Sequence, residues 1–170
     1  MYMKTIHIVG KRNKEQLLNG IDPKKMVRSC VRYEEPPHQR QVSLVNKYYL
    51  RHGDVMEKHV KREIAQKISG YKSQDVRKDI FDAGNLVTMM SVVEKLVVSK
   101  LRCNYCCGVV KVLFTCVRDH QQWTLDRTDN NMGHSADNTV ICCLKCNLER
   151  RVLDSEKFTF TKQMRIKKTE

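Results

Sequence analysis

The chain has 170 residues, of which 41% are hydrophobic and 30% are charged, and its formal net charge is +13. The apolar content suffices for a modest core and excludes a chain that is disordered throughout. The positive charge favours a polyanionic partner such as nucleic acid, because neutralised phosphates release counterions, with solubility or attraction to anionic lipid as the alternatives.

The first hundred residues predict a basic, mainly helical region. They carry 20 Lys or Arg and 11 Asp or Glu, a net charge of +9. Residues 4–9 are typical of a short strand. Residues 11–41 predict a flexible loop or arm, because Pro36 and Pro37 resist helix formation.

Two helices are predicted over residues 42–69, separated by Gly53. The second has an apolar face with a spacing of four residues, formed by Met56, Val60, Ile64 and Ile68. Residues 70–80 predict a loop or short helix, and residues 88–100 a further helix that Thr88 or Asn85 could cap.

The pattern changes at residue 101, where we predict a second domain that spans residues 101–170. It contains three expected strands, at residues 109–117, 122–126 and 139–142. A helical pattern follows at 144–153 and a short amphipathic element at 158–168, and turn-forming residues fill 128–133. The fold class expected for the whole chain is therefore α+β.

Seven of the eight cysteines lie between Cys103 and Cys146. The first ten residues lack the features of a signal peptide, and no run of about 18 apolar residues predicts a membrane span. A disulfide framework is therefore the weaker interpretation. We expect an intracellular protein of a reducing compartment, cytoplasm or nucleus, that is neither secreted nor bound to a membrane.

Two Cys-x-x-Cys units predict a metal site. They are Cys103-Asn-Tyr-Cys106 and Cys143-Leu-Lys-Cys146, and together they supply four thiolates, the donor set of a structural zinc ion. Buried free cysteines are the alternative interpretation. The neighbouring Cys107 and Cys142 allow a different set, although it breaks both two-residue spacings.

Between and after these units the chain reads Leu125-Asp126-Arg127, then Gly133-His134 and Asn138, and finally Cys146-Asn147. In this combination, over residues 103–151, the sequence resembles the HNH endonucleases of the zinc-bearing ββα-metal, or treble-clef, type. This variant of the motif is similar to HNH-like proteins of phages and of large DNA viruses of eukaryotes. The resemblance therefore adds the virion as an alternative location of the protein.

The resemblance implies a metal-dependent endonuclease that hydrolyses phosphodiester bonds in double-stranded DNA. Asp126 and Asn147 would hold a catalytic Mg²⁺ or Mn²⁺, ions that prefer oxygen ligands. Asn138 would orient the hairpin, and the four cysteines would hold a separate structural Zn²⁺. The simpler alternatives are a turn or cap role for Asp126 and an N-cap role for Asn147.

One departure from the family affects the chemistry. The family has its general base, a histidine, directly after the aspartate, and this chain has Arg127 there. Arginine does not accept a proton at usable pH, so Arg127 would bind phosphate instead. His134, Asp129 and His120 remain candidate bases, with His134 first, alongside water activated by metal alone. Loss of catalysis is a further outcome.

Phosphate contacts are expected from four basic side chains near the motif, although a solvated surface explains them equally well: Arg118, Lys145, Arg150 and Arg151. The alternative to an enzyme is a catalytically inactive, zinc-stabilised protein that binds nucleic acid or serves as a viral structural protein.

Overall fold

The computed structural model describes residues 27–28, 31 and 33–164, and the fold is α+β, as predicted. Helices α2 (His38–Tyr49), α3 (Glu57–Arg77) and α4 (Met89–Val98) come first. The antiparallel hairpin of β1 (Trp123–Arg127) and β2 (Thr139–Cys143) follows, and then α5 (Leu144–Arg150) and α6 (Ser155–Gln163). The expected strand at 4–9, residues 11–26, 29–30 and 32 of the expected arm, and residues 165–168 of the last expected element lie outside the described residues.

Helix α2 begins earlier than predicted, within the segment assigned to a flexible arm. Its first residue is His38, directly after Pro37, and Gln41 is buried in its first turn. A proline is compatible with this position because the first helical residues need no intrahelical partner for their N–H groups. The prediction of a loop up to residue 41 is therefore wrong for residues 38–41.

Helix α3 has the predicted apolar face and extends further than expected. Val60 and Ile64 are buried, and Met56 and Ile68 pack against the core. The helix continues through Gly70 to Arg77, where a loop or a short helix was predicted. Tyr71 and Asp75, one turn apart, are both buried, and this packing outweighs the roughly 1 kcal/mol cost of a helical glycine.

Helix α4 is close to its prediction, with Thr88 as its cap. The Thr88 hydroxyl accepts a hydrogen bond from the Ser91 N–H, and the Ser91 hydroxyl accepts one from the Thr88 N–H. This reciprocal pair satisfies two amides that would otherwise lack partners. Gly53, predicted to separate two helices, lies between α2 and α3 with a φ of +66°.

Residues 109–117 do not form the predicted strand. Only isolated bridges occur in this segment, between Arg102 and Val109, Lys111 and Gln122, and Val27 and Cys116. The buried Gln41 side chain takes the place of a neighbouring strand: its Oε1 accepts from the N–H groups of Val112 and Leu113, at 2.8 and 2.9 Å. The β-branched residues of this segment favoured a strand, but two of its backbone N–H groups bond to the Gln41 side chain and not to a neighbouring strand.

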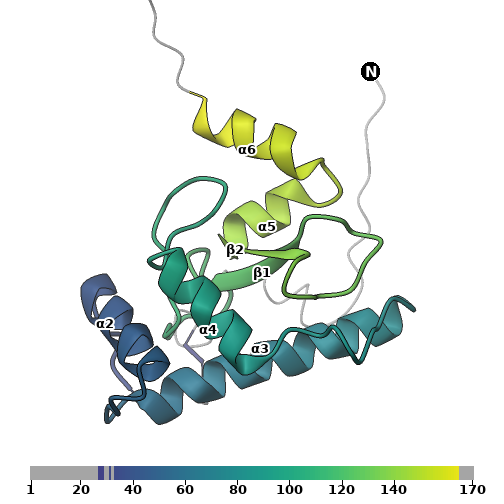
Figure 1. The fold of residues 1–170 in the computed structure, drawn as a ribbon. Helices are drawn as coiled ribbons and strands as arrows, with labels where there is room; N and C mark the ends of the chain where they lie inside the picture. Colours follow the sequence, from purple (N-terminus) through teal and green to yellow (C-terminus); the bar gives the residue numbers. More distant parts are fainter. Residues whose placement is uncertain (1–26, 29–30, 32, 165–170) are drawn as a thin grey trace, which may run out of the picture.

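The hairpin agrees with two of the predicted strands. Its register pairs Trp123 with Cys143 and Arg127 with Thr139, so residues 128–138 form a long connecting loop. Figure 1 shows the hairpin between α5 on one side and α3 on the other. One hydrophobic cluster includes residues of the helices, such as Leu44 and Val93, and of the hairpin, such as Trp123. Among the described residues, no helix is both long and apolar enough to cross a membrane.

Candidate metal centre

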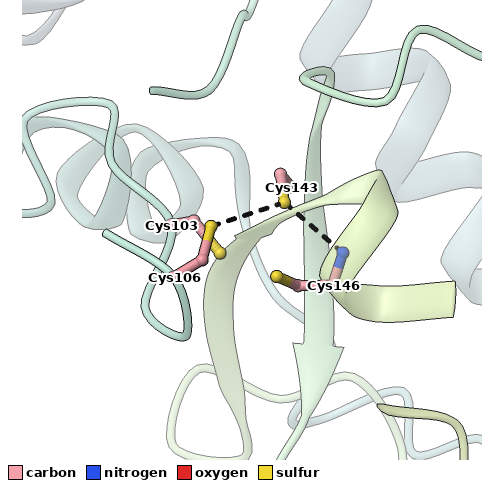
Figure 2. A group of neighbouring side chains, drawn as sticks. All are labelled: Cys103, Cys106, Cys143 and Cys146. Atoms are coloured by element: carbon pink, nitrogen blue, oxygen red, sulfur yellow. Dashed lines mark hydrogen bonds between the residues drawn. The ribbon is translucent and has the colours of Figure 1, made fainter. Parts of the chain in front are cut away.

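The four cysteines of the two Cys-x-x-Cys units converge at the end of the hairpin. Cys103 and Cys106 come from a turn after α4, Cys143 ends β2, and Cys146 lies in the first turn of α5 (Figure 2). All four Sγ atoms lie within 4.8 Å of one another. The alternative set that uses Cys107 and Cys142 is not the one that the fold brings together.

The spacing of these thiols fits a zinc ion. Zn–S bonds of about 2.3 Å in a tetrahedron place the sulfurs roughly 3.8 Å apart. The Cys106 and Cys143 Sγ atoms are 4.0 Å apart. Cys103, Cys143 and Cys146 are buried, and Cys106 is exposed, so solvent reaches the cluster from the side of Cys106. The cluster could therefore hold a structural Zn²⁺.

The first unit is a tight turn closed by backbone hydrogen bonds and followed by a glycine. The Cys107 N–H donates to the Cys103 carbonyl and the Cys103 N–H to the Gly108 carbonyl. A Cβ atom at Gly108 would lie 3.3 Å from the Cys106 Sγ, so a side chain there would crowd the sulfur. The Asn104 N–H donates to the Ile141 carbonyl and fastens this turn to β2.

Without a cation, the thiols divide unevenly between charged and neutral forms. The pKa of Cys103 is lowered to about 5, chiefly because the Cys143 thiol donates a hydrogen bond to it. The same bond is the main cause that raises the pKa of Cys143, and burial is the main cause that raises the pKa of Cys146 to about 12. One thiolate is thus stable alone, and four thiolates need a bound cation.

Asp126, the candidate ligand of a catalytic ion, is held inside the protein. Its carboxylate accepts hydrogen bonds from the Arg150 Nε, from the Arg150 Nη2 at 3.0 Å, and from the Tyr105 hydroxyl at 2.7 Å. Asp126 is 7% exposed and Arg150 is 1% exposed. The carboxylate is therefore neutralised by a buried arginine.

Asn147 and Asn138 both bind neighbouring backbone. The Asn147 amide donates to the Thr124 hydroxyl and to the Leu125 carbonyl, at 3.1 and 3.2 Å, and so joins α5 to β1. The Asn138 Oδ1 accepts from the Asp129 N–H at 2.8 Å, and its Nδ2 donates back to the Asp129 carbonyl. Asn138 thus closes the loop between the two strands.

The side chains of Arg127 and His134 lie near Asp75 of α3. The His134 ring Nδ1 is 2.7 Å from Asp75 Oδ1, and the His134 N–H donates to Asp75 Oδ2. Arg127 donates to the Met132 carbonyl, with its Nη1 3.9 Å from Asp75 Oδ1. Since consecutive strand residues point to opposite sides, Asp126 and Arg127 diverge.

His134 is buried and stacks on the Tyr71 ring, with 4.5 Å between ring centroids. Burial lowers its pKa below the ordinary 6.5, and Asp75 only partly opposes this shift. Gly133 is required beside it, because a Cβ there would come within 2.7 Å of the Ile80 carbonyl oxygen. A neutral imidazole, oriented by a carboxylate, results.

The other basic candidates differ in exposure. Arg118, Lys145 and Arg151 are exposed, whereas the Arg150 guanidinium is enclosed by Asp126 and by the carbonyls of Arg127 and Leu153. The sequence reasoning missed Asp75, Tyr71 and Tyr105. Asp75 and Tyr71 share one face of α3 at a spacing of four residues, but Gly70 beside them favoured a loop. Tyr105 lies between Cys103 and Cys106 of the first Cys-x-x-Cys unit.

Comparisons with protein-family models, with curated protein sequences and with solved structures find no match to this chain. The four-cysteine cluster and the hairpin followed by a helix are consistent with a zinc-binding ββα module of treble-clef type.

Proposed function

We propose that this protein is a zinc-stabilised nucleic-acid-binding protein whose C-terminal half is a module of the HNH type. Cys103, Cys106, Cys143 and Cys146 hold the zinc ion as a structural element, and double-stranded DNA is the partner. The net charge of +13 supports a polyanionic partner. Exposed Arg118, Lys145 and Arg151 add phosphate contacts near the module.

The state of Asp126 is the observation that favours binding over catalysis. A metal ligand needs free oxygen lone pairs that face a space open to water and substrate. Here both carboxylate oxygens accept hydrogen bonds, from Arg150 and Tyr105, and the group is buried. Releasing it would leave the Arg150 charge buried without a partner, at a cost of about 3–5 kcal/mol.

The test is binding of the zinc-loaded full chain to a fluorescent duplex, measured by anisotropy over a series of salt concentrations. We expect an affinity that falls steeply and linearly on a log–log plot as salt rises, since phosphate neutralisation dominates. Absence of salt-sensitive binding to DNA would reject the proposal and favour the viral structural role.

An HNH endonuclease dependent on Mg²⁺ or Mn²⁺ is the second candidate. Asn147 lies in the first turn of α5, bound to Thr124, and Asp126 follows Thr124 on the same side of β1. Both proposed ligands therefore lie on the side of the strand that faces α5. In this mechanism Asn147 and Asp126 would hold the ion through oxygen ligands, the ion would supply an activated water, and Arg150 would have to leave the carboxylate to contact the phosphate.

A plasmid nicking assay separates the two candidates. The binding protein should leave supercoiled plasmid intact with Mg²⁺ or Mn²⁺, at a level equal to that of Asp126→Ala. Cleavage by wild type that Asp126→Ala and Asn147→Ala both abolish, with folding verified by circular dichroism, would establish the nuclease and overturn the binding-only proposal.

A further inference from the structure

The charges of helix α3 are segregated between its two sides. Its acidic side chains are Glu57, half-buried at the first residue, and Glu63 and Asp75, which are 4% and 1% exposed. Glu63 pairs with Arg28 at 3.0 Å, and Asp75 bonds to His134. The two buried acidic groups of α3 are therefore paired with partners on its inward side.

The outward side of α3 carries only positive charge. Lys58, Lys61, Arg62 and Lys72 are all exposed, and at 3.6 residues per turn they fall within one arc of about 100°. No ion pair joins any of the four to another residue within the part of the chain that the structure describes. Figure 1 shows α2, α4 and the hairpin together on one side of α3.

The geometry of this basic face suits an extended backbone of phosphates. Ala65 and Ser69 lie in the middle of the arc, so small side chains separate the basic ones and allow close approach. Lys58 and Lys72 are about 21 Å apart along the axis at 1.5 Å per residue. That distance matches roughly six base pairs of duplex at 3.4 Å each.

We propose that this basic face of α3 is the surface on which the DNA backbone docks. The inference rests on the proposed nucleic-acid binding and assigns it to a particular surface, outside the zinc module. A membrane is a poorer partner, because an interfacial helix turns its apolar side to the lipid. In α3 the apolar side chains Val60, Ile64 and Tyr71 are 1%, 0% and 7% exposed, and Val76, near the end of the helix, is the single large apolar side chain of α3 that is mainly exposed.

Charge reversal on α3, compared with equal charge reversal elsewhere, tests the assignment. The test variant is Lys61→Glu with Lys72→Glu, and the control is Lys100→Glu with Lys157→Glu, two exposed lysines outside α3. Both variants have the same net charge. We expect the test variant to bind a duplex at least about tenfold more weakly, and the control to stay within about threefold of wild type.

A milder pair, Lys61→Gln with Lys72→Gln, measures the contacts themselves. Each lost phosphate contact should reduce the slope of log affinity against log salt by about 1, so this variant should lose about 2. Equal weakening in test and control variants, with an unchanged slope in the Gln variant, would overturn the assignment while leaving DNA binding intact.

Two other outcomes are distinguishable. If wild type binds vesicles rich in phosphatidylserine and no duplex, the surface belongs to a membrane and the inference is wrong. If wild type binds neither, the proposed function fails with it. Zinc content and circular dichroism confirm that each variant is folded, as expected for substitutions on an exposed helix face.

Discussion

Two of the helices that contact the hairpin, α5 and α3, hold it by different chemistry. On the side of α5, Arg150 forms a charged pair with Asp126, and the same helix supplies Cys146 to the four-thiol cluster. On the side of α3, Asp75 holds His134, whose low pKa keeps the ring neutral near pH 7, and Tyr71 stacks against that ring.

The difference shows how the hairpin accommodates two adjacent opposite charges. Asp126 and Arg127 are neighbours in β1, and each is directed to another element: Asp126 to the arginine of α5, and Arg127 to the region of Asp75 in α3. The α5 contacts are strong and intolerant of a missing partner, whereas the α3 contacts are moderate in energy. Four perturbations, from the largest effect to the smallest, test this ranking.

Removal of zinc should have the largest effect. Structural zinc in small modules contributes on the order of 10 kcal/mol at neutral pH, comparable to the whole stability of a domain. We expect one zinc ion per chain, and a strong chelator or Cys146→Ser should abolish the cooperative thermal transition. Circular dichroism melts and metal analysis provide the measurement.

Cys107→Ser is the matched control, because Cys107 is exposed and adjacent to a ligand but lies outside the cluster. It should retain a full complement of zinc and the wild-type melting temperature. A melting temperature unaffected by chelation would contradict the metal site.

Breaking the Asp126–Arg150 pair should have the second largest effect. Asp126→Leu leaves a buried arginine without its partner, and we expect a loss of about 3–5 kcal/mol in the free energy of unfolding, measured in urea. The double variant with Arg150→Met should recover a large part of this loss. A single-variant cost below about 1 kcal/mol would mean that the pair is not buried as described.

Removing the Asp75 carboxylate should cost less. Asp75→Ala deprives the His134 N–H and ring of their partners, which predicts a loss of about 1–3 kcal/mol. Asp137→Ala removes an exposed carboxylate of the adjoining loop and should be nearly neutral. If Asp75→Ala proved costlier than Asp126→Leu, the ranking of the two helices would be reversed.

The smallest effect concerns pH. The folded-state pKa of His134 lies below its ordinary 6.5, so the unfolded chain binds the proton more readily. Its contribution to stability is full above pH 6.5 and decreases as the pH falls below that value.

The measurement compares urea unfolding of wild type and His134→Gln, both zinc-loaded, between about pH 7.5 and 5.5. The difference removes the common pH dependence of the zinc site. Wild type should lose more stability than the variant on acidification. Parallel curves would contradict a buried neutral imidazole.

Local patterns predicted the elements whose stabilising contacts are local. The Thr88 cap, the apolar face of α3 and the two strands of the hairpin follow from spacing and side-chain type alone. The spacing of the cysteines likewise predicted the correct set of four. Each of these elements is determined by residues a few positions apart, or, for the cysteines, by the two-residue spacing that binding one metal ion requires.

Where the structure differs from the prediction, the cause is a contact between residues that are distant in sequence. Residues 109–117 have the composition of a strand, but Gln41, about seventy residues away, satisfies their backbone. The pairing of Asp126 with Arg150 depends on how α5 packs, which no pattern along the chain specifies. The catalytic roles implied by the resemblance to HNH enzymes stay predictions for this reason, since they require free groups and not merely the right residues.

The adjacent cysteines Cys142 and Cys143 have a consequence for the accuracy of folding. A strand that slips by one residue turns every side chain to the opposite side. In this hairpin, such a slip would present Cys142 where Cys143 now lies, so a misregistered strand would still offer a thiol to the metal. The native register is therefore favoured by burial of Ile141, by the Asn138 hydrogen bonds and by the Asp126–Arg150 pair. Metal binding by itself would not distinguish the two registers.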